Sequence, residues 1–196
     1  MARQVERREA TRGALITAAR ASLLAVGHEA TSTNVVLARA GVSRGALYHH
    51  FPSKTDLVAA VFETVSTELV GQAETAAKDT TTAREAITIS LKTWLRRVME
   101  PEAFRIILDI GPAVLGLARA RQIEDGITQA PLRQTITRAV ERGETGAVDV
   151  DLVARLLSAA AGELALAAAE RGLKQAGLSA FEAQLDALVS ALLPPR

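Results

Sequence analysis

The segment over residues 33–51 constrains this chain more than any other. It reads as two short helices joined by a tight turn at Gly41, where a glycine supplies the backbone freedom that ends the first helix. Ser43 stands where a side-chain oxygen can cap the second helix. The outer face of that second helix is short and mostly small or polar, and consists of Arg44, Gly45, Tyr48 and His49. A helix of this kind fits the major groove of DNA, where an arginine reaches base edges while hydroxyls and amides hold phosphates.

The run GVSRGALYHHF at 41–51, followed by PSKTDL at 52–57, resembles the DNA-binding domain of TetR/AcrR-type helix-turn-helix transcriptional regulators. The strong resemblance covers residues 7–60, and beyond it the chain is similar only in length and helical pattern. The resemblance implies an all-α fold of about nine or ten helices. It places a three-helix helix-turn-helix DNA-binding domain at 1–53 and a helical bundle for ligand binding and dimerisation at 54–196.

The family's DNA contacts are carried over residue by residue. Arg44 is expected to reach a base edge, with guanine favoured because its paired acceptors suit a guanidinium. Gly45 is expected to let the helix backbone approach the duplex closely, while Leu47 and Phe51 face inward. Contacts to phosphates are expected from Thr33, Ser43, Tyr48, His49 and Lys54.

Each contact residue also has a purely structural interpretation. Ser43 can serve only as a cap, Tyr48 can only pack, and Arg44 can simply be solvated. The adjacent pair His49 and His50 suggests a metal site at first sight. Neighbouring residues on a helix point about 100° apart, however, and no cysteine or acidic pair completes a shell. We therefore expect no metal and no cofactor.

Composition favours helix, because alanine and leucine dominate and alternating β-branched runs are missing. The chain has no cysteine, which excludes disulfides, thiolate metal sites and a cysteine nucleophile. The net charge of +1 hides an asymmetry, since residues 1–60 hold eight lysines and arginines against four acids. A positive end suits a protein that presents that end to a polyanion, although ordinary surface charge gives the same count.

The helix boundaries follow from caps and breakers. A first helix is expected over about 5–26, ended by Gly27. Capping pairs are expected at Ser53 with Asp56, at Thr82 with Glu85, and at Ser179 with Glu182. The Gly111–Pro112 pair is expected to break a helix that begins at Pro101. A separate helix is expected over about 128–142, with Pro131 near its start.

The resemblance implies two further sites in the body of the protein. A small-molecule pocket is expected between Phe62 and Leu166, although bulky residues at helical spacing are more often plain core. Its candidate lining residues are Phe62, Trp94, Met99, Phe104, Arg105 and Asp109. A homodimer is expected through the last two helices, although the same apolar stripe also suits intramolecular core. Its candidate residues are Leu156, Leu157, Leu164, Phe181, Leu185, Leu188 and Leu192.

These observations predict a sequence-specific DNA-binding regulator, most simply a repressor that binds a palindromic operator as a dimer. A small apolar or amphipathic effector would release it. An activator, and a helical bundle that binds ligands or partners without an operator, remain open alternatives. An enzyme is not expected, because the chain lacks a Gly-rich phosphate loop, HExxH and a Gly-x-Ser-x-Gly elbow. The N-terminus lacks a signal-peptide pattern, and the apolar stretch 156–169 is interrupted by Ser158, Gly162 and Glu163. We therefore expect a cytoplasmic protein without a membrane partner.

Overall fold

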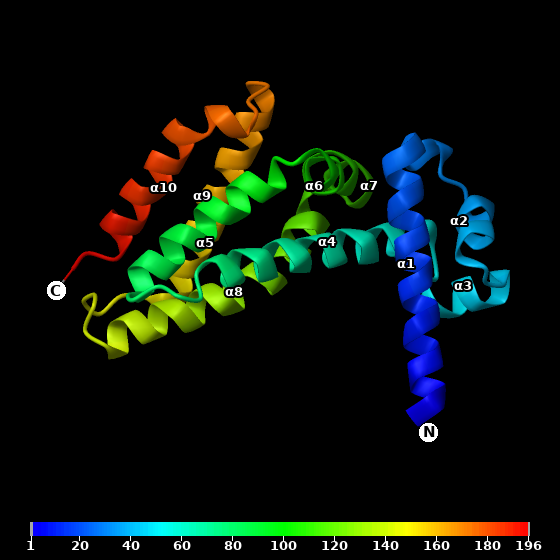
Figure 1. Cartoon of the computed structure of the whole chain (residues 1–196), viewed down its shortest axis with the longest axis horizontal. Coiled ribbons are helices and arrows are strands. Elements are labelled where there is room, and N and C mark those ends of the chain that lie inside the picture. Colours follow the sequence, from blue (N-terminus) through cyan, green and yellow to red (C-terminus); the bar gives the residue numbers. More distant parts are fainter. Residues whose placement is uncertain (1, 196) are drawn as a thin grey trace. The chain divides into compact units, whose positions relative to one another are not determined.

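The computed structural model describes residues 2–195 and confirms the all-α prediction, since these residues form helices and no strand (Figure 1). The first four helices are α1 (Ala2–Ala30), α2 (Thr33–Ala40), α3 (Arg44–His50) and α4 (Lys54–Ala76). The remaining α-helices are α5 (Ala83–Val98), α6 (Pro101–Phe104), α7 (Gly111–Leu115), α8 (Leu117–Glu141), α9 (Val150–Glu170) and α10 (Ser179–Leu192). A π-helical segment, η1 (Arg105–Ile110), and a 3-10 turn, η2 (Gln175–Gly177), complete the chain.

The described chain divides into two compact units. Unit one contains the residues up to Val65 together with Arg105–Ala120, and unit two contains Ser66–Phe104 with the residues from Arg121 onward. Both α4 and α8 therefore contribute residues to each unit. The domain division between residues 53 and 54 stays a sequence prediction.

Unit one is built on α1, which packs against α2, α3 and η1. Its core includes the fully buried side chains of Leu15, Leu23 and Val36. The predicted end of the first helix at Gly27 coincides with a kink, where φ is 77° and ψ is 176°. The backbone at Gly27 is not helical, so the predicted end of the first helix is confirmed, and a separate turn then reaches Ala30.

The expected break at Gly111–Pro112 is wrong, because the helical path continues through η1 into α7. Pro112 lies in the first turn of α7, a position that tolerates a proline. Gly111 is buried, and a Cβ there would lie 2.3 Å from Cδ2 of Phe62. Glycine is therefore needed here for close packing and not for a turn.

The predicted separate helix over 128–142 is also wrong, since α8 is one helix from Leu117 to Glu141 with Pro131 in its interior. A proline removes one backbone hydrogen bond, yet the flanking Leu132 and Ile136 are buried in the core. Thr135 Oγ1 donates to the Pro131 carbonyl at 3.0 Å. Tertiary packing therefore outweighs the local signal of the proline.

In unit two, α5, α9 and α10 pack against one another (Figure 1). Leu95, Leu157 and Leu185 are fully buried in this unit. Two ion pairs join α5 to α10: Lys92 Nζ lies 2.6 Å from Asp186 Oδ1, and Arg96 binds Glu182 through two hydrogen bonds of 2.6 and 2.8 Å.

Three predicted caps have different outcomes. The Ser53–Asp56 pair is confirmed, since the Asp56 N–H donates to Ser53 Oγ at 3.1 Å. Thr82 Oγ1 also accepts the N–H of Glu85 as predicted. The cap at Ser179 is wrong: α10 is preceded by Leu178 without a side-chain cap, and Glu182 binds Arg96 instead. The Glu182 carboxylate thus forms an ion pair between two helices and not a local cap.

Among the helices of residues 2–195, α9 is the one whose length and composition would allow it to cross a membrane. This finding departs from the expectation based on its interrupted apolar run. Core helices of soluble proteins meet the same criterion, so the finding alone gives weak support for a span. About 33% of its apolar window is buried within this chain, which leaves apolar surface for another contact.

Candidate nucleic-acid interface

Side-chain caps and a glycine turn fix α2 and α3. Ser32 Oγ accepts the N–H of Val35 at 3.3 Å, and Ser43 Oγ accepts the N–H of Ala46 at 3.2 Å. Between the helices, Gly41 adopts φ 66°, and its N–H donates to the Leu37 carbonyl at 3.0 Å. The left-handed backbone at Gly41 strongly favours glycine, which explains the tight turn.

The short helix α3 has an inner and an outer face. Leu47 and the following Phe51 are buried, which holds the helix on unit one. On the outer face, Tyr48 is 47% exposed. The other three outer residues, Arg44, Gly45 and His49, are exposed as well. The structure thus brings four of the seven predicted DNA-contact residues together on one open face of unit one.

Arg44 is already engaged by a neighbour that sequence reasoning missed. Its Nη2 donates to Oδ1 of Asn34 at 2.7 Å, which links the start of α3 to the first turn of α2. Both side chains are exposed. The Asn34 amide holds the guanidinium at the outer face, and because the bond is solvent-exposed it can be exchanged for a bond to a base. The polar side chain of Asn34 beside the apolar pair Val35 and Val36 was the available signal.

Thr33 and Lys54 lie at the starts of α2 and α4 and are half-buried. Lys54 Nζ donates to the His28 carbonyl at 2.5 Å, so its ammonium also ties α4 to the end of α1. Burial, followed by the nearby Lys54 charge, lowers the pKa of His28. A small cavity of about 10 Å³ lies under these residues, lined by side chains that include Leu23, Val36 and Leu57. Its volume is too small for an organic effector.

The two histidines at the end of α3 do not converge. The ring centroids of His49 and His50 lie 5.4 Å apart, with the ring planes at 74°. Across residues 2–195, no three histidine, aspartate or glutamate side chains gather in a way that would hold a metal ion. His49 faces solvent, while His50 is half-buried beside Phe51.

Three pocket candidates belong to unit one. Phe62 is fully buried and packs over Gly111. Arg105 donates through Nη1 to the Leu24 carbonyl, so its guanidinium holds η1 to α1. Asp109 is exposed. Of these three, only Phe62 is both apolar and enclosed.

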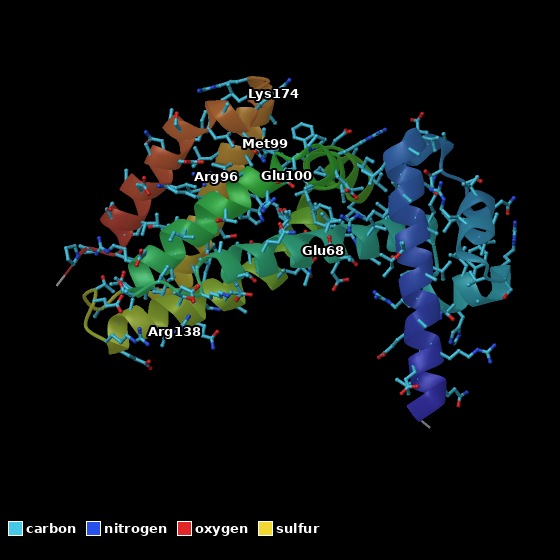
Figure 2. The ribbon with its side chains drawn as sticks, viewed as in Figure 1. Glu68, Arg96, Met99, Glu100, Arg138 and Lys174 are labelled. Atoms are coloured by element: carbon cyan, nitrogen blue, oxygen red, sulfur yellow. The ribbon has the colours of Figure 1, made fainter. Side chains whose placement is uncertain are left out.

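The other three candidates, Trp94, Met99 and Phe104, are half-buried residues of unit two. Met99 follows directly after α5, between the labelled Arg96 and Glu100 (Figure 2). Gln175 Nε2 donates to the Arg96 carbonyl and to Glu100 Oε1, each at 3.4 Å, which holds η2 at this end of α5.

Unit two also contains a buried polar group, Ser66, and a half-buried one, Glu124, that the sequence did not single out. The hydroxyl of Ser66 is buried without a hydrogen-bond partner in the described chain. Burial, with the Asp125 charge as a second cause, raises the pKa of Glu124 to about 7. Ser66 lies on α4 and Glu124 on α8, and the sequences of these two helices contain no pattern that would have pointed to either residue.

The seven dimer candidates divide by exposure. Leu157, Phe181 and Leu185 are buried in the core of unit two, whereas Leu156 is 45% exposed. The remaining three, Leu164, Leu188 and Leu192, are half-buried. Leu152, which sequence reasoning missed, lies one turn before Leu156 on α9 and is 52% exposed. The apolar surface available to a second copy is therefore centred on Leu152 and Leu156.

Comparison with known proteins supports the assignment over most of the chain. Residues 15–61 match the model "Bacterial regulatory proteins, tetR family", and residues 68–192 match "Tetracyclin repressor-like, C-terminal domain". An uncharacterized HTH-type transcriptional regulator of Mycobacterium tuberculosis is 34% identical over 136 residues, which are 69% of this chain and 56% of that protein. The match therefore spans just over half the length of the mycobacterial relative. The HTH-type regulator CymR of Pseudomonas putida is 47% identical over 60 residues, which are 31% of this chain and 30% of that protein.

Solved structures agree with this result. A TetR-family transcriptional regulator of Pectobacterium atrosepticum has a TM-score of 0.79 and 30% identity, covering 97% of this chain and 98% of that one. RolR in complex with resorcinol has a TM-score of 0.75 at 18% identity, covering 98% and 91%, and shows the shared fold. These relatives are transcriptional regulators and not enzymes, in line with the prediction. By its sequence in both parts and by its fold, the chain belongs to the TetR family of bacterial transcriptional regulators and carries the family's helix-turn-helix domain.

Proposed function

We propose that this protein is a transcriptional repressor that binds a palindromic operator as a homodimer. The observation that carries the proposal is the open outer face of α3, where Arg44, Tyr48 and His49 stand clear of the core that Leu47 and Phe51 anchor. A rigidly capped helix with such a face suits the major groove. Two copies in a symmetric dimer would read half-sites one helical turn apart, about 34–36 Å.

The seven contact residues have separate roles in this proposal. Arg44 exchanges its bond with Asn34 for a base edge, and Gly45 allows close approach of the backbone. The phosphates are held by Thr33, Ser43, Tyr48, His49 and Lys54. Because chromosomal DNA is the partner, the protein is placed in the cytoplasm.

A small apolar or amphipathic effector is proposed to release the operator. Proteins of related fold support this idea, since RolR forms a complex with resorcinol and FadR from Bacillus subtilis forms one with stearoyl-CoA. The candidate lining residues remain Phe62, Trp94, Met99, Phe104, Arg105 and Asp109. Only an effector with different affinities for two states shifts the equilibrium, and a coupling of about 1–3 kcal/mol changes DNA affinity by five- to 150-fold.

The decisive experiment is selection of bound duplexes from a random pool by the full chain at low ionic strength. We expect an inverted repeat to be enriched and to be bound by a dimer. Repeating the selection with phenols and with acyl-CoA esters tests for release. If no duplex is retained at any ionic strength, the chain is a helical bundle without an operator. Transcription from the selected operator in a purified system then separates repression from activation.

A further inference from the structure

The first part of α1, about two turns over residues 4–10, reaches beyond the core of unit one. Residues 4–10 are all exposed, and the first fully buried side chain of the helix is Leu15. With a rise of 1.5 Å per residue, this exposed part of the helix extends about 10 Å. A helix segment that is exposed on every side gains no stability from packing, so packing does not account for its composition.

Two arginines near the start of α1, Arg8 in this segment and Arg12 just after it, lie beside the end of α3. Arg8 and Arg12 are four residues apart and therefore share one face of the helix. The Arg12 guanidinium lies 5.5 Å from the centroid of the Phe51 ring, at the residue that follows α3. Both arginine charges also act on His50, where they contribute, after burial and His49, to a lowered pKa. The shared face is therefore turned toward the end of the recognition helix.

Among the described residues, no carboxylate pairs with the positive charges at this place. Arg8 and Arg12 are exposed, and in the described part of the chain neither forms an ion pair with a carboxylate. Like charges spaced four residues apart on a helix destabilise it by a few tenths of a kcal/mol. A cluster of this kind suits a partner with closely spaced negative charges, and the DNA backbone is such a partner.

We propose that Arg8 and Arg12 extend the DNA-binding surface and contact phosphates flanking the bases that α3 reads. This inference rests on the proposed function, because it takes α3 as the groove-binding helix. The surface is continuous with α3 through the contact between Arg12 and Phe51. Because phosphates are the same at every base pair, these contacts add affinity without sequence preference.

The test uses the full chain and two duplexes of the selected operator. The short duplex ends at the selected sequence, and the long one adds about ten base pairs on each side, in two unrelated flanking sequences. Affinity is measured over a range of salt concentrations for wild type, Arg8→Gln and the double variant Arg8→Gln/Arg12→Gln. Arg138→Gln, on α8 (Figure 2), is the control that removes one charge from unit two.

A dimer of the double variant lacks four charges, and each phosphate contact contributes about 0.9 to the slope of log affinity against log salt. We expect the slope on the long duplex to fall by about 2–4, with equal effect for both flanks, and Arg138→Gln to leave it unchanged. Thermal melting controls for the loss of the Arg12–Phe51 contact, and Arg8→Gln alone makes the test without touching that contact.

Three possible results distinguish failure of this inference from failure of the proposed function. A wild-type slope in both variants, with the operator still selected, overturns this inference and leaves the proposed function intact. A lower melting temperature with an unchanged slope assigns the arginines a structural role, and likewise overturns it. Failure of the wild-type chain to select any duplex overturns the proposed function first, and this inference with it.

Discussion

Arg119 Nη2 lies 2.9 Å from Asp56 Oδ1, so that an ion pair joins the first turn of α8 to the first turn of α4 within unit one. The other carboxylate oxygen accepts the Ser53 hydroxyl at 2.7 Å. The Ser53 bond is the main reason why the pKa of Asp56 lies below its ordinary value, and the Arg119 bond is the second. One carboxylate therefore caps α4 and also connects it to the segment that follows α7.

Asp56→Asn should lower the free energy of unfolding at pH 7 by about 0.5–1.5 kcal/mol, because it weakens a cap and removes a largely solvent-exposed ion pair. The folded-state pKa is depressed, so the stabilisation is complete above the unfolded-state pKa and is lost as the pH falls through the folded value. Urea denaturation at pH 7 and pH 3 checks both parts. Asp79→Asn is the matched control, since Asp79 is exposed. If both substitutions change the free energy of unfolding equally, the ion pair between Asp56 and Arg119 contributes nothing to stability.

Gly111→Ala should destabilise the protein by about 1–3 kcal/mol, because its Cβ would meet the ring of Phe62 and the core must shift. Gly126→Ala is the control in α8, where an added Cβ has nothing within 4 Å. That change should stabilise the protein by about 0.5–1 kcal/mol, as expected for alanine in an exposed helix interior. Thermal unfolding of both variants measures these two changes in stability. If Gly111→Ala leaves the stability unchanged, the packing argument is contradicted.

Arg44→Ala should weaken binding to the selected operator by about 1–3 kcal/mol and relax the preference at one base pair of each half-site. Asn34→Ala removes only the side chain that holds Arg44 in the free protein. This variant should therefore keep the wild-type preference for the base that Arg44 contacts. Binding titrations against single-base variants of the operator distinguish the two changes. If Arg44→Ala keeps the full preference, another side chain reads that base.

Lys54→Ala should weaken binding to all duplexes and flatten the salt dependence by about 2 for a dimer, one contact being lost in each subunit. Lys54 also bonds the His28 carbonyl, so the unfolding free energy must be measured in parallel. Lys78→Ala serves as the control, since Lys78 is exposed between α4 and α5. An unchanged salt slope together with reduced stability would assign Lys54 a structural role only.

Glu124→Gln should increase stability at pH 8 by about 1–3 kcal/mol, because burial of the ionised carboxylate is costly. The pKa of Glu124 is raised to about 7, so the folded state binds the extra proton between the unfolded value and pH 7. Stability therefore falls as the pH rises through this window, and the substitution should flatten that slope. Denaturation curves from pH 4 to pH 8 provide the test. Glu141→Gln, an exposed residue of the same helix, should leave the slope unchanged.

Leu152→Glu combined with Leu156→Glu should convert the proposed dimer into a monomer with weak operator binding, because two charges would replace the exposed apolar surface of α9. Sedimentation analysis of the two chains at equal concentration measures the change. Leu117→Glu is the control, because Leu117 is 54% exposed on α8. A dimer that persists in the double variant would place the subunit interface elsewhere.

Sequence and structure differ most where local and long-range forces compete. The glycine turn, the cap at Ser43 and the inward positions of Leu47 and Phe51 were predictable, because each depends on backbone geometry or on a period of a few residues. The continuous α8 was not predictable, since burial around Pro131 outweighs the local preference of proline. The missing cap at Ser179 was not predictable either, and the Glu182 side chain binds Arg96 on another helix.

The sequence by itself determined the helical class, the family and the order of residues along the recognition helix, since these are encoded in short-range spacing. Only the tertiary structure decided which side chains are free to bind. It showed that Arg44 is held by Asn34, that Lys54 is bonded to α1, and that Arg8 and Arg12 lie beside α3. The physical reason is that these side-chain partners come from helices that are distant in sequence. Packing brings the partners together, and such contacts produce no periodic pattern in the sequence.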